Sequence, residues 1–123
     1  ILKKLFILIK FYFRNFRMNT EVDPVLVGEV EDIEVGTVED FEYKDINFAI
    51  FRLETGFFCT QGNCNCEERA PLSEAEVEGE ELECVSCGET YSIVSGDCIS
   101  QPELDSLKTY DISEEDNNIY LNL

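Results

Sequence analysis

Two cysteine pairs, Cys64-Asn65-Cys66 and Cys84-Val85-Ser86-Cys87, decide how this chain is expected to fold, and seventeen residues separate them. Turn-forming residues flank both pairs, with Gly62 and Asn63 before the first and Gly88 after the second. Such residues favour loop tips between strands, so each pair is predicted to lie at the tip of a loop. If the two tips face each other, their four sulfur atoms form a cage.

Four converging thiolates favour zinc, iron or an iron-sulfur cluster, because soft sulfur ligands suit these centres whereas hard cations prefer oxygen. The chain contains no histidine, so a metal site here uses sulfur alone or sulfur together with carboxylate. The candidate ligands are Cys64, Cys66, Cys84 and Cys87. The alternative is a disulfide framework, since the six cysteines of the chain are an even number.

The segment from Cys64 to Tyr91 resembles the cluster-binding region of Rieske iron-sulfur proteins, in which a Cys-X-His loop is followed by a Cys-X-X-His loop. The spacing agrees with that pattern, and Pro71-Leu72-Ser73 matches the Pro-Leu-Ser between the two loops. Cys66 and Cys87 stand where the family has histidines. Both departures fall on ligand positions, and both replace histidine by another ligand.

The resemblance covers about residues 25–123. Residues 48–56 resemble the family's hairpin before the first loop, residues 91–96 resemble its turn after the second loop, and residues 107–110 match its Leu-Lys-Thr-Tyr segment. High-potential members also carry a disulfide between the two loops. Arg69 and Ser86 occupy the corresponding positions here, so the loops resemble those of the low-potential ferredoxin type.

Short apolar runs with period two predict an all-β fold. Val25 to Val27 with Val30 are expected to form the first strand, and residues 38–43 and 46–53 the next two. A turn is expected at residues 54–56, before a strand that leads into the first cysteine loop. Strands at this spacing favour an antiparallel sandwich or barrel, and the resemblance implies a Rieske-like antiparallel β-sandwich with two cluster-binding loops over residues 25–123.

The N-terminal residues 1–20 differ from this body. Residues 1–17 combine apolar side chains with five basic residues and no acidic one, which predicts a short amphipathic basic helix. This segment is too short and too interrupted by charge to span a bilayer. Three interpretations stay open: a targeting or membrane-surface helix, a docking helix for a partner complex, and an artefact that precedes Met18.

Charge limits the partners of the body. The net charge is −18, and after residue 17 only four basic residues face 27 acidic ones. Such a surface repels nucleic acid and anionic membranes. It is either simply well solvated or it steers the protein toward a redox partner protein with a basic surface.

The resemblance implies a small one-electron carrier that binds a 2Fe-2S cluster, with Cys64 and Cys84 on the inner iron and Cys66 and Cys87 on the outer iron. It does not imply an enzyme, because a separate reductase or oxygenase would perform the chemistry. The alternative is a structural or interaction subunit with zinc bound by four thiolates, or with no cluster. Cys59 and Cys98 are expected to fill the core. The absence of a secretory signal and the preference for reduced cysteines favour a mitochondrial or cytoplasmic location, not secretion.

Overall fold

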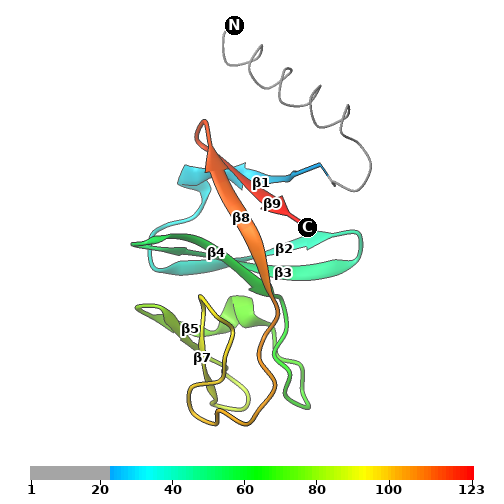
Figure 1. Ribbon diagram of the computed structural model, residues 1–123, viewed down its shortest axis with the longest axis vertical. Coiled ribbons are helices and arrows are strands. Elements are labelled where there is room, and N and C mark those ends of the chain that lie inside the picture. Colours follow the sequence, from blue (N-terminus) through cyan, green and yellow to red (C-terminus); the bar gives the residue numbers. More distant parts are fainter. Residues whose placement is uncertain (1–22) are drawn as a thin grey trace, which may run out of the picture.

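The computed structural model describes residues 23–123, which form antiparallel strands and two short 3-10 helices (Figure 1). The first elements are β1 (Val25–Glu29), η1 (Val30–Asp32), β2 (Thr37–Tyr43), β3 (Ile46–Leu53), β4 (Gly56–Gln61) and η2 (Leu72–Glu74). The later elements are β5 (Glu76–Glu78), β6 (Glu81–Glu83), β7 (Thr90–Ser92), β8 (Thr109–Glu115) and β9 (Asn118–Asn122). The predicted all-β class is confirmed. The predicted N-terminal helix lies outside the described residues, and the division at residues 20–25 stays a prediction.

Two-residue turns close two of the hairpins. Lys44 and Asp45, with φ of 51° and 64°, join β2 to β3, and Asp116 and Asn117, with φ of 53° and 68°, join β8 to β9. Left-handed conformations at both central residues are typical of a type I′ turn, whose twist matches that of the flanking strands. Each chain reversal therefore takes only two residues and fixes the strand register.

Strand β3 lies at the centre of the molecule, because both of its faces are buried. Phe48 and Ile50 point into a first core, where they meet Ile119 and Leu121 of β9. The alternate residues of β3 point into a second core: Ala49, Phe51 and Leu53. An uninterrupted apolar run is the pattern that a strand covered on both faces requires.

The strands form a six-stranded sheet in the order β1-β9-β8-β4-β3-β2 and a small sheet in the order β5-β6-β7. Strand β8 pairs with β9 over most of its length, but with β4 only where Tyr110 and Thr109 lie opposite Cys59 and Thr60. The β1-β9-β8 half therefore crosses the β2-β3-β4 half, with the first core between them (Figure 1). The second core joins β3 to the small sheet, and the cysteine loops project from this end.

Two element boundaries differ from the sequence-based expectation. Val30 opens η1 and does not extend the first strand, because the Glu29 amide donates a 2.9 Å hydrogen bond to the Asp32 carboxylate in a capping box. Gly56, expected in a turn, begins β4 opposite Leu53. No helix within residues 23–123 is long and apolar enough to cross a membrane.

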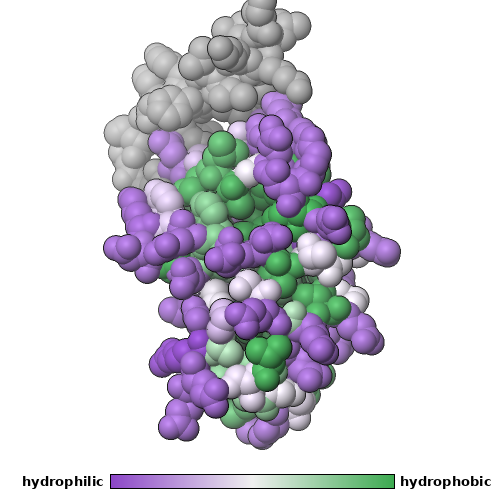
Figure 2. All heavy atoms as spheres, turned by 180° about the vertical axis from the view of Figure 1, so that it is seen from behind, coloured by the Kyte–Doolittle hydropathy of each residue, from purple (hydrophilic) through white to green (hydrophobic). Residues whose placement is uncertain are grey.

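The surface of the described residues is strongly acidic. Hydrophilic side chains cover much of the face in Figure 2, with hydrophobic areas between them. The basic residues of this part of the chain are Lys44, Arg52, Arg69 and Lys108. With only these four basic residues against the acidic ones, the described part of the chain carries a large negative charge, as the sequence indicates.

Candidate metal centre

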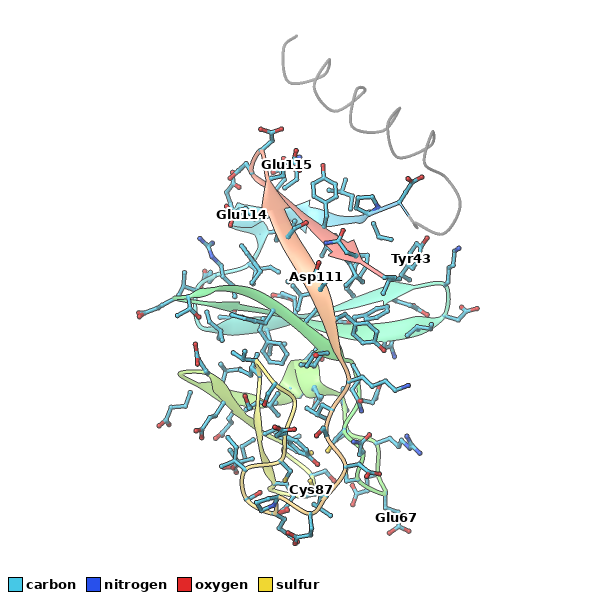
Figure 3. All side chains as sticks on the ribbon, viewed as in Figure 1. Tyr43, Glu67, Cys87, Asp111, Glu114 and Glu115 are labelled. Atoms are coloured by element: carbon cyan, nitrogen blue, oxygen red, sulfur yellow. The ribbon has the colours of Figure 1, made fainter. Side chains whose placement is uncertain are left out.

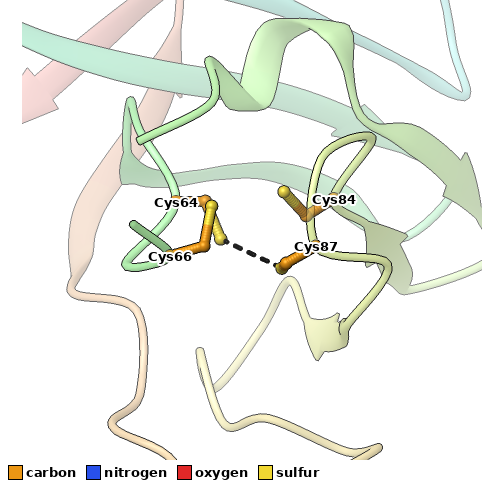
Figure 4. A group of neighbouring side chains, drawn as sticks. All are labelled: Cys64, Cys66, Cys84 and Cys87. Atoms are coloured by element: carbon orange, nitrogen blue, oxygen red, sulfur yellow. Dashed lines mark hydrogen bonds between the residues drawn. The ribbon is translucent and has the colours of Figure 1, made fainter. Parts of the chain in front are cut away.

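The first cysteine loop connects β4 to η2 and is held by its own backbone. The Cys64 amide donates a 2.8 Å hydrogen bond to the Ala70 carbonyl, which closes the base of the loop. Arg69 adopts a left-handed φ of 52°, and its amide donates to the Cys66 carbonyl at 3.0 Å. These bonds turn the chain back within a few residues, so both sulfur atoms of the loop lie on the same side of it (Figure 4).

The second cysteine loop connects β6 to β7 and forms a similar tight turn. The Gly88 amide donates to the Cys84 carbonyl at 2.9 Å, and the Cys84 amide donates to the Glu89 carbonyl at 3.0 Å. Gly88 has a φ of 76°, which glycine adopts without steric cost. This turn brings Cys87 back beside Cys84.

The two loops bring all four candidate cysteines together. The sulfur atoms of Cys64, Cys66, Cys84 and Cys87 lie within 4.8 Å of one another (Figure 4). The sulfur atoms of Cys64 and Cys87 are 3.8 Å apart. We call this group the cysteine cage. The predicted convergence of the two loop tips is present in the structure, and the role of the four residues as ligands stays a prediction.

The cage has a buried side and an exposed side. Cys64 and Cys84 are 0% and 1% exposed and belong to the second core, whereas Cys66 is half-buried and Cys87 is exposed. Figure 3 shows Cys87 and Glu67 at the end of the molecule opposite Glu115. A centre held by these residues would therefore lie close to the surface at one end of the sandwich.

Backbone amides stabilise negative charge on three of the four sulfur atoms. The Ala70 amide is the main reason that the pKa of Cys66 falls from its ordinary value to about 7. Burial raises the pKa of Cys64 to about 12, opposed by a hydrogen bond from the Cys66 amide. Burial also raises the pKa of Cys87, opposed by the Glu89 amide. Because an amide bonded to a thiolate favours the charged form, the first loop favours the thiolate of Cys66, whereas burial outweighs the amides at Cys64 and Cys87.

The donor set fits a metal–thiolate centre. Four sulfur atoms without histidine suit zinc, iron or an iron-sulfur cluster. A metal–sulfur bond of about 2.3 Å in tetrahedral geometry places neighbouring sulfur atoms about 3.8 Å apart, which equals the distance between Cys64 and Cys87. In a cluster with two irons, the two pairs of ligands lie farther apart than the ligands of a single ion do.

A polar network that sequence analysis missed anchors the first loop. The Gln61 side-chain amide donates to the Asn63 carbonyl at 2.7 Å and to the Asn65 side-chain oxygen at 2.8 Å, while its own oxygen accepts from the Lys108 amide at 2.8 Å. Asn65 in turn donates to the carbonyls of residues 105 and 106 at 3.4 and 3.3 Å. The residue between the first two cysteines is thus tied to the segment before β8.

Two further contacts brace the second loop. The Ser86 hydroxyl donates a 2.7 Å hydrogen bond to the Glu68 carboxylate of the first loop. The Gln101 side chain donates to the Glu89 carboxylate at 2.6 Å. Since Asn65 also contacts residues 105 and 106, the segment 101–106 runs beside both loops. No motif in the sequence signals any of these side-chain pairs.

Cys59 and Cys98 lie outside the cage. Both are buried, as expected for residues that fill the core. Cys59 is part of the first core, where burial raises its pKa to about 12. Cys98 is part of the second core and pairs through its backbone with Tyr91. The pKa of Tyr91 is raised, first by burial and then by the nearby sulfur atoms of Cys64, Cys98 and Cys87. Tyr91 thus belongs to the same buried cluster as Cys64 and Cys84.

A family model described as Rieske [2Fe-2S] domain matches residues 23–111. No curated protein matches the chain. The matched residues include both cysteine loops and all strands up to the first part of β8.

Solved structures agree on the fold. The ferredoxin of carbazole 1,9a-dioxygenase from Nocardioides aromaticivorans IC177 superposes with a TM-score of 0.74 at 18% identity, covering 81% of this chain and 97% of that chain. A ferredoxin of Sphingomonas yanoikuyae B1 gives 0.74 at 20% identity, covering 82% and 99%. A putative NADH-dependent nitrite reductase small subunit from Mycobacterium tuberculosis gives 0.75 at 15% identity, covering 85% and 97%.

Proposed function

Because this chain belongs to the Rieske [2Fe-2S] domain family, we propose that it is a small one-electron carrier that binds a 2Fe-2S cluster through Cys64, Cys66, Cys84 and Cys87. The observation that carries the proposal is the family match across both cysteine loops, whose four sulfur atoms converge at one end of the sandwich. A bound cluster supplies the one-electron chemistry. The residues of the chain hold it, tune its charge and present it to a partner.

The cage residues divide this work by their burial. The buried Cys64 and Cys84 would hold the inner iron, and the more exposed Cys66 and Cys87 would hold the outer iron. Electrons would leave on the exposed side, because only that side reaches the surface. The amides of Ala70 and Glu89 offset part of the negative charge on the outer thiolates.

The proposed partner is a separate redox protein with a basic surface. One superposed structure is a complex of reduced oxygenase and oxidized ferredoxin in carbazole 1,9a-dioxygenase. For this chain, an acidic body would steer such a partner toward it. Val85, 55% exposed beside the cage, offers apolar contact at the docking site. We propose no catalytic reaction for the chain itself.

A second candidate function follows from the distance between Cys64 and Cys87. The family resemblance assigns these residues to different irons, yet their sulfur atoms are separated by the edge length of a tetrahedron around one ion. This distance favours a single zinc or iron ion. With zinc, the domain would be a structural or interaction module, because zinc does not change its oxidation state.

We also propose a reducing compartment, mitochondrial or cytoplasmic. All six cysteines are free, and a metal–thiolate cage needs reduced sulfur. A role of residues 1–17 in docking to a membrane surface or a complex is part of the same proposal, based on their charge pattern.

Purification under anaerobic conditions with metal and sulfide analysis tests these functions. Two irons and two sulfides per chain, with an EPR signal after reduction, support the electron carrier. One zinc without sulfide supports the second candidate. One redox-active iron without sulfide retains electron transfer but excludes the cluster.

A further inference from the structure

The two cysteine loops come from separate parts of the chain and are joined by few direct contacts. Within residues 23–123, and apart from contacts among the cysteine sulfur atoms, the hydrogen bond from Ser86 to Glu68 is the one that links residues 62–71 directly to residues 84–89. Its length is 2.7 Å between the Ser86 Oγ and the Glu68 Oε2. This bond is therefore the direct hydrogen bond between the two loops, which are otherwise held by the second core and by the segment 101–106.

Glu68 also lies close to the cage along the chain. It follows Cys66 by two residues, while its carboxylate accepts from Ser86, the residue that precedes Cys87. Glu68 thus connects the two more exposed cysteines of the cage. The opposite side needs no such link, because Cys64 and Cys84 are enclosed in the second core.

Both ends of this bond are held in tight turns. Arg69, next to Glu68, is fixed by the hydrogen bond that its amide donates to the Cys66 carbonyl. Ser86 lies within the turn that is closed by the hydrogen bond from the Gly88 amide to the Cys84 carbonyl. Neither side chain has to order a flexible segment in order to meet the other. A hydrogen bond to a carboxylate is also stronger than a neutral one, although exposure to water weakens it.

We propose that Glu68 and Ser86 form a clasp across the exposed side of the cysteine cage, which keeps Cys66 and Cys87 together on a bound metal centre and slows its loss. This inference rests on the proposed metal-binding function. It applies equally to a cluster and to a single ion, because both are held from the two loops. Glu68 and Ser86 are positioning residues, since they act through the neighbouring cysteines.

The test uses cobalt(II) bound to the reduced full-length protein. Its thiolate charge-transfer absorption is followed after addition of excess chelator, which gives the rate of metal loss. Ser86→Ala is expected to raise this rate about fivefold, the effect of losing one exposed hydrogen bond to a charged group. Ser86→Thr keeps the hydroxyl and is expected to restore the slow rate.

Variants of two glutamates distinguish the effect of the hydrogen bond on the rate of metal loss from the effect of charge. Glu68→Gln keeps an oxygen that accepts from Ser86 and is expected to change the rate less than Glu68→Ala. Glu67→Gln is the matched control, because Glu67 is an exposed neighbour whose carboxylate makes no hydrogen bond within the described residues. Its rate is expected to equal that of the wild type.

The outcomes separate this inference from the function on which it rests. A wild-type protein that binds neither cobalt nor an iron-sulfur cluster overturns both. If the wild type binds cobalt but Ser86→Ala loses it at the wild-type rate, only the clasp is overturned. The clasp also fails if Glu67→Gln accelerates the loss as much as Glu68→Ala, because the effect is then one of charge alone.

Discussion

The sulfur atoms of Cys64 and Cys87 lie 3.8 Å apart although they belong to different loops. Because each loop contributes one member of this pair, removal of either sulfur opens the cage between the loops. We expect Cys64→Ser and Cys87→Ser to be purified with less than about a tenth of the wild-type metal, since serine oxygen is a poor replacement for soft thiolate. Elemental analysis gives the measurement.

Cys98→Ser is the control for this prediction, because Cys98 is buried in the same core as Cys64 but lies outside the cage. It is expected to keep the wild-type metal content per folded chain. Full metal content in Cys87→Ser would mean that three cysteines suffice and that Cys87 is not a ligand.

The reduction potential is predicted to be low and independent of pH. If the cage holds a 2Fe-2S cluster, two thiolates in place of two imidazoles add negative charge, so we expect a value nearer to about −400 mV than to the −150 to +300 mV of Rieske centres. The chain has no histidine that could couple proton and electron uptake. A redox titration monitored by EPR between about pH 6 and 10 is the measurement, and a steep fall of the potential with pH would contradict the prediction.

Cys66 is predicted to be the most reactive thiol of the metal-free protein. The Ala70 amide lowers its pKa to about 7, so the thiolate dominates above pH 7 and the thiol below it. Alkylation by iodoacetamide should therefore accelerate about tenfold between pH 6 and 8. Mass spectrometry of peptides identifies the site, with the buried Cys59, whose pKa is raised to about 12, as an internal control. Preferential modification of Cys87, which is exposed but has a raised pKa, would show that exposure outweighs ionisation.

The sequence was sufficient to predict the features that depend on local pattern. The apolar run of β3 predicted its bounds, Ile46–Leu53, as the structure has them, because a strand buried on both faces leaves a continuous signal. The two cysteine pairs and the turn residues beside them predicted two loop tips, because these too are local features of the sequence. Val30 was misassigned because its apolar side chain fits a strand, whereas the bond from Glu29 to Asp32 decides the backbone.

The contacts that brace the cage could not be predicted in this way. Glu68 is one of 27 acidic residues, and nothing in its sequence neighbourhood distinguishes it from Glu67. Its bond to Ser86 exists because two separate turns place both side chains at the same edge of the cage. Gln61 likewise meets Lys108 only because β4 pairs with β8.

Gln61 is predicted to stabilise the first loop more than an average surface residue does. Its side chain makes three hydrogen bonds and is partly buried, so Gln61→Ala leaves polar groups without partners and should lower the free energy of unfolding by about 1–3 kcal/mol. Gln101→Ala is the matched control, since Gln101 is exposed and makes one side-chain bond, to Glu89. Its cost should stay within about 0.5 kcal/mol. Equal losses in denaturant titrations of the two metal-free variants would refute the anchoring role of Gln61.

Gly62 is predicted to be intolerant of any side chain, because it packs against the backbone of the central hairpin. A Cβ atom at this position would lie 2.6 Å from the carbonyl carbon of Asn47. The oxygen of the same carbonyl group accepts a 2.9 Å hydrogen bond from the Gly62 amide. Asn47 belongs to β3, so it cannot move aside without disturbing both cores. We expect Gly62→Ala to cost about 2–3 kcal/mol of unfolding free energy and, since Gly62 begins the first loop, to weaken metal binding as well. Gly28→Ala is the control, because the nearest atom there belongs to a side chain and not to the backbone: it is the Asp32 carboxylate oxygen at 3.0 Å, which accepts from the Glu29 amide. The cost should stay below about 1 kcal/mol. Denaturant titration of the metal-free proteins avoids any contribution from bound metal. Similar losses in the two variants would show that the first loop can shift away from β3 without penalty.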